Sequence, residues 1–244
     1  MSGQRGGRGG IGISLFPGGL EGRPYRRGRG GNRFNQNDHT RFEEYHQSDD
    51  DDFFYDNQNP TFESIKLENN WEDHVDDFEQ SNLNPNLIHM IFSIGFPKPT
   101  KVQSLCLKPI LLHRNIIVQS ASNSGKTTSL CIGVLQNINV EERSTQALIL
   151  VPNRLFASQI RECLLNLGKK MNEFQISVFI NDDKIDQQKE EAQKLPHIVV
   201  ATPGRACKLI QSNFLKLDQL KMICFDEVDE FVTRGSINKV GQIL

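Results

Sequence analysis

One stretch of the chain, residues 116–127, constrains its fold more than any other. It reads Ile-Ile-Val-Gln-Ser-Ala-Ser-Asn-Ser-Gly-Lys-Thr, so an apolar segment is followed by small residues and then by Gly125, Lys126 and Thr127. This order predicts a buried strand, a turn and the first residues of a helix. Because the N-terminus of a helix has unpaired N–H groups and a positive dipole end, the turn is suited to bind phosphate.

The residue types in the turn predict how a nucleoside triphosphate would be held. Lys126 would reach the terminal phosphates, and the Thr127 hydroxyl would hold Mg²⁺. A strict phosphate loop has a glycine six residues before the lysine, where this chain has Ser120. The alternative is a polar surface turn that happens to precede a lysine. The predicted phosphate-binding set is Ser122, Asn123, Ser124, Gly125, Lys126, Thr127 and Thr128.

A second apolar segment, residues 222–225, leads directly into Asp226 and Glu227. A strand that delivers two carboxylates at its end is the usual partner of a phosphate loop. Asp226 would hold Mg²⁺ through water, and Glu227 would orient or deprotonate the attacking water. An acidic helix start is the alternative, but it does not explain a spacing of about one hundred residues from Lys126. The predicted catalytic residues are therefore Lys126, Asp226 and Glu227, with Thr127 and Asp226 at the metal.

Short apolar segments and helical patterns alternate through the second half of the chain. This alternation predicts an α/β fold in which helices cover both faces of a parallel sheet. Ligands bind such sheets at the carboxyl ends of the strands, where both motifs fall. The predicted strands are 116–118, 147–151, 176–180, 198–200 and 222–225.

The first 66 residues differ in composition from the rest. Residues 1–34 hold seven arginines and one acid, and residues 35–66 are rich in Asp and Glu. Both segments have few aliphatic side chains, so we expect a basic disordered tail and an acidic disordered spacer. Repeated Arg-Gly-Gly units in the tail favour contact with RNA. The alternatives are a purely solubilising tail and, for Asp49–Asp52, a peptide that docks on a basic partner.

The five cysteines are odd in number and far apart in sequence. They favour free thiols in a reducing compartment over a disulfide framework or a zinc site. No apolar run reaches the ~18–20 residues that span a membrane. The Gly/Arg-rich start is not a secretory signal. These features predict a cytoplasmic or nuclear protein without membrane contact.

Several motifs, taken together and in order, resemble the DEAD-box RNA helicases. Asp226–Asp229 is similar to Asp-Glu-Ala-Asp, and residues 95–103 resemble the adenine-reading Q motif, with Phe78 as its upstream aromatic. Residues 152–157 are similar to Pro-Thr-Arg-Glu-Leu-Ala, and 202–205 match Thr-Pro-Gly-Arg. The resemblance covers residues 67–244, is strongest toward initiation factor 4A and its relatives, and implies a RecA-like (P-loop NTPase) lobe.

The resemblance implies an ATP-dependent RNA helicase that uses ATP and Mg²⁺. Gln103 would bind the edge of adenine, and Phe78 would stack on its ring. Single-stranded RNA would be bound without regard to its sequence. The alternative for Arg154 is a surface charge that pairs within its own helix. A translation or RNA-processing scaffold protein is an expected partner. The implied RNA-contacting residues are Pro152, Arg154, Thr202, Pro203, Gly204 and Arg205.

The chain also departs from the family pattern. Asn123 replaces a glycine of the phosphate loop, and Asn153 replaces a threonine. Asn181 and Asp182, followed by Asp183, stand where a Gly-Gly pair is expected beside RNA. The sequence ends at Leu244, before the Ser-Ala-Thr motif and the second RecA-like lobe, so turnover by this chain alone is expected to be weak. Two alternatives therefore stay open. One is an inactive single-lobed regulator that binds ATP or a partner, and the other is an RNA-binding protein driven by its Arg-Gly-Gly tail.

Overall fold

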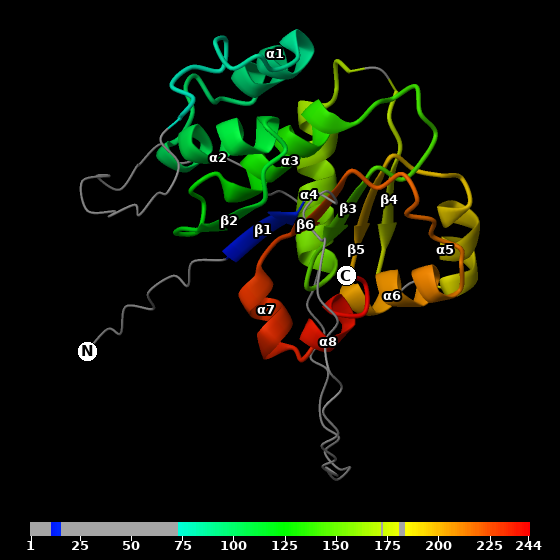
Figure 1. Cartoon of the computed structure of the whole chain (residues 1–244). Coiled ribbons are helices and arrows are strands. Elements are labelled where there is room, and N and C mark those ends of the chain that lie inside the picture. Colours follow the sequence, from blue (N-terminus) through cyan, green and yellow to red (C-terminus); the bar gives the residue numbers. More distant parts are fainter. Residues whose placement is uncertain (1–10, 16–72, 172, 181–183) are drawn as a thin grey trace, which may run out of the picture. The chain divides into compact units, whose positions relative to one another are not determined.

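The computed structural model describes residues 11–15, 73–171, 173–180 and 184–244. The predicted acidic spacer and most of the predicted basic tail lie outside these ranges. Within them, strands and helices alternate as the sequence indicates (Figure 1). The strands are β1 (Ile11–Leu15), β2 (Ile116–Gln119), β3 (Ala147–Leu150), β4 (Ile176–Phe179), β5 (Ile198–Ala201) and β6 (Met222–Phe225).

The described strands form one sheet in the order β2-β1-β6-β3-β5-β4. The pairs β6–β3, β3–β5 and β5–β4 are parallel, whereas β1 is antiparallel to both β2 and β6. Since two reversals cancel, β2 runs in the same direction as β6. The carboxyl ends of β2, β3, β4, β5 and β6 therefore meet at one edge of the sheet, as a RecA-like α/β fold requires.

Strand β1 was not expected. The composition of residues 1–34 predicts an unstructured tail, but Ile11–Leu15 pairs along its length with β2 and β6. The prediction is therefore wrong for these five residues. Any extended segment can pair its backbone with a strand on each side. Hydrogen bonds to β2 and to β6 therefore compensate for the weak strand propensity of a Gly/Arg-rich sequence.

Helices connect the strands and begin where the sequence supplies caps. Asn84 accepts a hydrogen bond from the N–H of Asn86 at the start of α1, and Pro85 occupies its first turn. Asn153 likewise accepts from the N–H groups of Leu155 and Phe156 at the start of α4. The helices are α1 (Pro85–Ser93), α2 (Lys101–Leu111), α3 (Lys126–Asn137), α4 (Arg154–Leu167), α5 (Ile185–Ala192), α6 (Pro203–Gln211), α7 (Val228–Thr233) and α8 (Ile237–Val240).

The core has two parts, one on each face of the sheet. Along β3, Ala147 and Ile149 pack in one cluster with α1, α3 and α4, while Leu148 and Leu150 pack in the other with α6, α7 and α8. This alternation is the two-residue period of a strand that is buried on both faces. The helices that carry the two clusters lie on opposite sides of the sheet in Figure 1.

The described helices include none that is both long and apolar enough to cross a bilayer. The five cysteines all lie in the described ranges, and none of them forms a disulfide bond, as the sequence predicts.

Candidate functional site

The segment between β2 and α3 forms a tight loop at the carboxyl edge of the sheet. Asn123 and Gly125 have positive φ angles of 59° and 98°, and Gly125 is the N-cap of α3. Asparagine is the non-glycine residue that best tolerates this region, so the turn is kept although Asn123 replaces a glycine. The hydroxyl groups of Ser120 and Ser124 lie 2.6 Å apart across the loop.

The loop curls around the ammonium group of Lys126. Its Nζ donates hydrogen bonds to the carbonyl oxygens of Ser120 (2.9 Å) and Ala121 (2.8 Å), and the residue is buried. A phosphate would have to replace these two carbonyls as the partner of the ammonium group. The predicted phosphate-binding lysine therefore lies within the loop, and its exchange of partners is part of any binding event.

Thr127 joins the loop to the carboxylates that follow β6. Its Oγ1 donates a hydrogen bond of 2.9 Å to Oδ2 of Asp226, ninety-nine residues away in sequence. Asp226 is almost fully buried at the end of its strand, while Glu227 is partly exposed. The structure thus brings together Lys126, Thr127, Asp226 and Glu227, which the sequence predicted as one site.

Burial sets the electrostatics of both carboxylates. Desolvation raises the pKa of Asp226, against smaller effects of the Thr127 hydroxyl, the Glu227 N–H and Lys126 that lower it. Desolvation also raises the pKa of Glu227, and the nearby Asp226 and Asp229 raise it further. Glu227 is held at a φ of 53°, an unusual conformation for a residue other than glycine that concentrates at functional sites. A cation would relieve this accumulation of negative charge.

These pKa shifts predict how stability depends on pH. A carboxyl group whose pKa is raised by folding stabilises the fold at pH values below the pKa that it has in the unfolded chain, which is 3.8 for Asp. This contribution to stability is lost as the pH rises through the pKa that the group has in the folded chain. At pH 8, Asp226→Asn should therefore raise the melting temperature of the ligand-free chain by ~2 °C or more. The increase should shrink as pH falls toward 4. Differential scanning fluorimetry across this range measures it, with the exposed Asp218→Asn as control. A rise in melting temperature that is the same at every pH would contradict a pKa of Asp226 that is raised by folding.

A second layer of contacts holds the loop against α2. The Thr100 hydroxyl donates to the Ser124 carbonyl (2.8 Å), and Thr100 and Gln103 form a capping box at the start of the helix. Gln103 is fully buried, and its Nε2 has no partner among the described residues. The sequence analysis missed the loop contact of Thr100, although Thr-x-x-Gln is a recognisable capping-box pattern.

Phe78 does not lie at a ligand surface. Its side chain is 0% exposed, belongs to the core on the α1 side of the sheet, and meets Phe92 edge-to-face with ring centroids 6.3 Å apart. In this ligand-free structure the packing leaves neither ring face exposed to a base, so stacking by Phe78 stays a prediction that would require the side chain to move. The aromatic residue fills the space beside α1 instead.

The residues expected to contact RNA follow β3 and β5 at the same edge of the sheet as the loop. Arg154 is exposed, whereas Thr202, Pro203 and Arg205 are buried, so the expected phosphate contact of Arg205 is not available at the surface. Thr202 is the N-cap of α6, but its Oγ1 is buried without a partner among the described residues. Of the two charged side chains predicted to bind RNA, only that of Arg154 is thus exposed at the surface.

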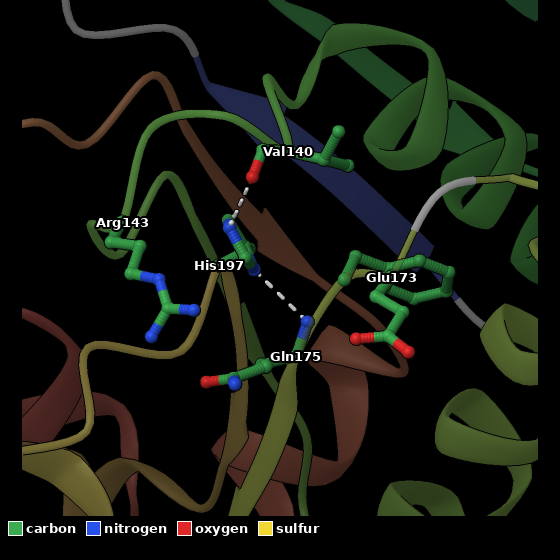
Figure 2. Close-up of a pocket in the computed structure, with 6 residues that line it drawn as sticks. Val140, Arg143, Glu173, Gln175 and His197 are labelled. Carbon is green, nitrogen blue, oxygen red and sulfur yellow. Dashed lines mark hydrogen bonds between the residues drawn. The ribbon is translucent and has the colours of Figure 1, made fainter.

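A pocket of about 230 Å³ lies elsewhere, at the amino ends of β4 and β5 (Figure 2). Both ring nitrogens of His197 are engaged there: Nδ1 accepts from the N–H of Gln175 (2.9 Å), and Nε2 lies 3.1 Å from the Val140 carbonyl. His197 therefore ties the loop after α3 to the start of β4 and has no nitrogen free for a ligand. The pocket lining is Val140, Arg143, Glu173, Phe174, Gln175 and His197.

Comparison with known families identifies the arrangement. The model of the DEAD/DEAH box helicase domain matches residues 100–244, more than half of the chain. The chain belongs to the DEAD/DEAH box helicase family. Its loop after β2 and its carboxylates after β6 both lie within the matched residues.

Individual helicases are similar to this domain in sequence and fold. The ATP-dependent RNA helicase eIF4A of Neurospora crassa is 35% identical over 178 residues, which are 73% of this chain and 45% of that protein. A DEAD box protein from the hyperthermophile Methanococcus jannaschii aligns with a TM-score of 0.62 at 29% identity, covering 70% of this chain and 46% of that one. The chain spans about half the length of the curated relatives it matches.

A third similar structure was determined with ligands. Dbp5 of S. cerevisiae, bound to RNA and ADP BeF3, aligns with a TM-score of 0.51 at 27% identity, over 60% of this chain and 37% of that one.

Proposed function

We propose that this chain is the ATP-binding lobe of an ATP-dependent RNA helicase similar to initiation factor 4A. The observation that carries the proposal is the 2.9 Å hydrogen bond from Thr127 to Asp226, which joins the phosphate loop to the acidic motif. Membership of the helicase family supports RNA as the second ligand. In a complete enzyme, closure around ATP would separate duplex strands locally.

The residues at the loop fit a nucleotide with Mg²⁺. The hydroxyl of Thr127 and the carboxylate of Asp226 are adjacent oxygen ligands of the kind that Mg²⁺ prefers. Burial raises the pKa of Asp226, and a bound cation would stabilise its charged form. When bound, Mg²⁺ would neutralise charge that develops on the phosphates. Lys126 would leave the Ser120 and Ala121 carbonyls and donate to the phosphates, and Glu227 would accept a proton from the attacking water.

Gln103 supports adenine as the base. Its Oε1 already accepts from the N–H of Thr100 (2.9 Å), so only the Nε2 donor remains for a ligand. A buried donor without a partner costs about 1–3 kcal/mol, and a ring nitrogen of adenine would recover part of this cost. GTP would place a different set of donors and acceptors at the same position, so we expect discrimination between the two nucleotides.

RNA would bind along the edge where β3 and β5 end. The exposed Arg154 can pair with backbone phosphates, and a similar protein, Dbp5, has been determined with RNA and ADP BeF3. This contact would not depend on base sequence. Because none of the five described cysteines forms a disulfide bond, we also propose that the chain acts in the cytoplasm or the nucleus.

Isothermal titration calorimetry tests the nucleotide assignment directly. The full chain should bind ATP–Mg²⁺ with a dissociation constant in the micromolar to millimolar range. It should bind GTP at least tenfold more weakly, because the Nε2 donor of Gln103 suits an acceptor nitrogen of adenine. Removing Mg²⁺ with EDTA should weaken ATP binding. No heat of binding at millimolar ATP would refute the proposal, and equal affinities for the two nucleotides would refute the role of Gln103.

A regulator that binds ATP without turning it over is the second candidate. It is favoured by the Lys126 ammonium group, which the loop already satisfies, and by the burial of Arg205 away from an RNA surface. Fluorescence anisotropy of labelled single-stranded RNA, measured with and without ATP–Mg²⁺, separates the two functions. RNA binding that ATP strengthens would support the helicase lobe, while ATP binding without any RNA binding would support the regulator.

A further inference from the structure

Three of the five cysteines lie in one part of the core. Cys131 in α3 and Cys224 in β6 belong to one cluster of buried side chains, and Cys163 in α4 packs against it. The side chains of Cys131 and Cys163 are hydrogen-bonded to one another. We propose that Cys131 and Cys163 are a site of reversible oxidation, at which a low-molecular-weight disulfide converts the two thiols into one disulfide bond between α3 and α4.

The packing of the two helices brings these thiols together. The helices lie against one another on the same face of the sheet (Figure 1), and both contribute buried residues to the cluster. A disulfide bond forms only between cysteines whose side chains point toward each other at close range. The hydrogen bond between the two thiols means that this orientation is already present in the reduced chain. Forming the disulfide bond therefore requires a local approach of α3 and α4, and no rearrangement of the fold.

Exposure differs between the two thiols and sets the order of the reaction. Cys131 is 0% exposed, whereas Cys163 is partly exposed on α4. The hydrogen bond with Cys163 raises the pKa of the Cys131 thiol, and burial raises it further, so Cys131 is a protonated thiol at neutral pH. A reagent in solution therefore reaches Cys163 first, and Cys131 acts as the second, resolving thiol.

The reaction consists of two successive thiol–disulfide exchanges. The Cys163 thiolate attacks one sulfur of oxidised glutathione, whose S–S bond breaks, and one glutathione leaves and takes up the proton of Cys163. The Cys131 sulfur then attacks the Cys163 sulfur, and the second glutathione leaves with the proton of Cys131. The two protein thiols lose two electrons in total, which the reagent gains as two glutathione thiols. Disulfide bonds in a reducing compartment are usually transient and redox-sensing, which fits a reversible step.

Two other cysteines provide contrasts within the same chain. Cys106 lies in a separate cluster on α2, and burial raises the pKa of its thiol to about 12. Cys207 is buried in α6 and donates a hydrogen bond of 3.3 Å to the side chain of Gln242. Neither thiol belongs to the cluster that holds Cys131. Oxidation that depends on proximity therefore selects the pair in α3 and α4.

The disulfide bond would also act on the nucleotide site, and this step rests on the proposed function. Cys131 lies in the same helix as Lys126 and about 7.5 Å further along the helix axis. Sulfur atoms that share a hydrogen bond are further apart than the ~2 Å of a disulfide bond, so bond formation draws α3 toward α4. The first turn of α3, which carries Lys126 and Thr127, moves with it. Because small displacements of binding groups are costly, we expect the oxidised chain to bind ATP more weakly.

Mass spectrometry of unreduced peptides tests the oxidation site directly. The folded full chain, incubated with oxidised glutathione, should give one disulfide-linked peptide pair, which contains Cys131 and Cys163 and which dithiothreitol removes. Cys163→Ser should abolish the pair, and Cys207→Ser should keep it. Cys131→Ala should stop at the first exchange, with one glutathione bound to Cys163. Circular dichroism checks that each variant is folded. Absence of this pair in the original chain, or an equal yield of other pairs, would overturn the proposal.

Calorimetry with ATP–Mg²⁺ tests the effect on the nucleotide site. The oxidised chain should bind ATP at least fivefold more weakly than the reduced chain, and dithiothreitol should restore the affinity. Cys163→Ser should bind ATP within twofold of the reduced original chain, before and after treatment with the oxidant. Equal ATP affinities of the oxidised and reduced chains would overturn the effect on the nucleotide site. A chain that forms the disulfide bond but binds ATP in neither state would refute the proposed function and support the oxidation site.

Discussion

Replacing Lys126 by alanine should reduce the affinity of the chain for ATP by about 100-fold or more. In the ligand-free structure, the ammonium group is buried within the loop and donates to the carbonyls of Ser120 and Ala121. With ATP bound, it would donate instead to phosphate oxygens. Charge-assisted hydrogen bonds contribute about 1.5–3 kcal/mol each, and tenfold in affinity corresponds to 1.4 kcal/mol. The loss of two such bonds gives the expected factor.

The matched control is Lys216→Ala, which removes the same charge from an exposed position away from the loop. Calorimetry of both variants with ATP–Mg²⁺ separates the local contact from the general loss of a positive charge. Lys216→Ala should keep the original affinity. Equal ATP affinity in Lys126→Ala and the unmodified chain would show that the nucleotide does not bind at this loop, and would remove the basis of the proposed function.

The central motifs were predictable because each is encoded locally. The segment from Ile116 to Thr127 contains its own strand, turn and helix start, and Asn123 has the positive φ that its side chain tolerates. The apolar run before Asp226 likewise predicts a buried strand. Parallel strands then bring both motifs to one edge of the sheet, so local patterns were enough to predict their meeting.

Features that depend on distant partners were not predictable in the same way. Ile11–Leu15 is short and lies in a Gly/Arg-rich context, and its pairing with β2 joins residues about one hundred positions apart. No local pattern reports such a contact, because strand formation depends on the neighbours that a segment finds. Phe78 shows the same limit, since the sequence cannot tell whether an aromatic residue near a motif packs inward or faces a ligand.

The role of Gln103 combines both situations. A glutamine three residues after Thr100 predicts a capping box, and the structure contains one. The capping box uses the Oε1 atom and leaves Nε2 buried beside the phosphate loop without a partner among the described residues. The approach of this side chain to Gly125 is a tertiary contact that no spacing rule predicts. It makes the glycine, as well as the lysine, a sensitive position of the site.

Gly125→Ala should therefore both destabilise the chain and weaken ATP binding. The residue has a φ of 98°, and an added Cβ would lie 2.8 Å from Nε2 of Gln103 and 2.9 Å from Oγ1 of Thr100. A positive φ costs an alanine about 1–2 kcal/mol, and overpacking typically costs about 1–3 kcal/mol more. Urea denaturation should show a free energy of unfolding reduced by ~2–5 kcal/mol, and calorimetry should show an ATP affinity reduced at least tenfold.

The chain offers a control in Gly235, which follows α7. Its φ of 66° is positive, like that of Gly125, but an added Cβ would meet no atom within 4 Å. Gly235→Ala therefore carries backbone strain without the collision and should cost only ~1–2 kcal/mol, with ATP affinity unchanged. The difference between the two variants measures how closely the phosphate loop packs on α2. If both variants lose the same stability and bind ATP equally well, the contact of the loop with Thr100 and Gln103 does not support the nucleotide site.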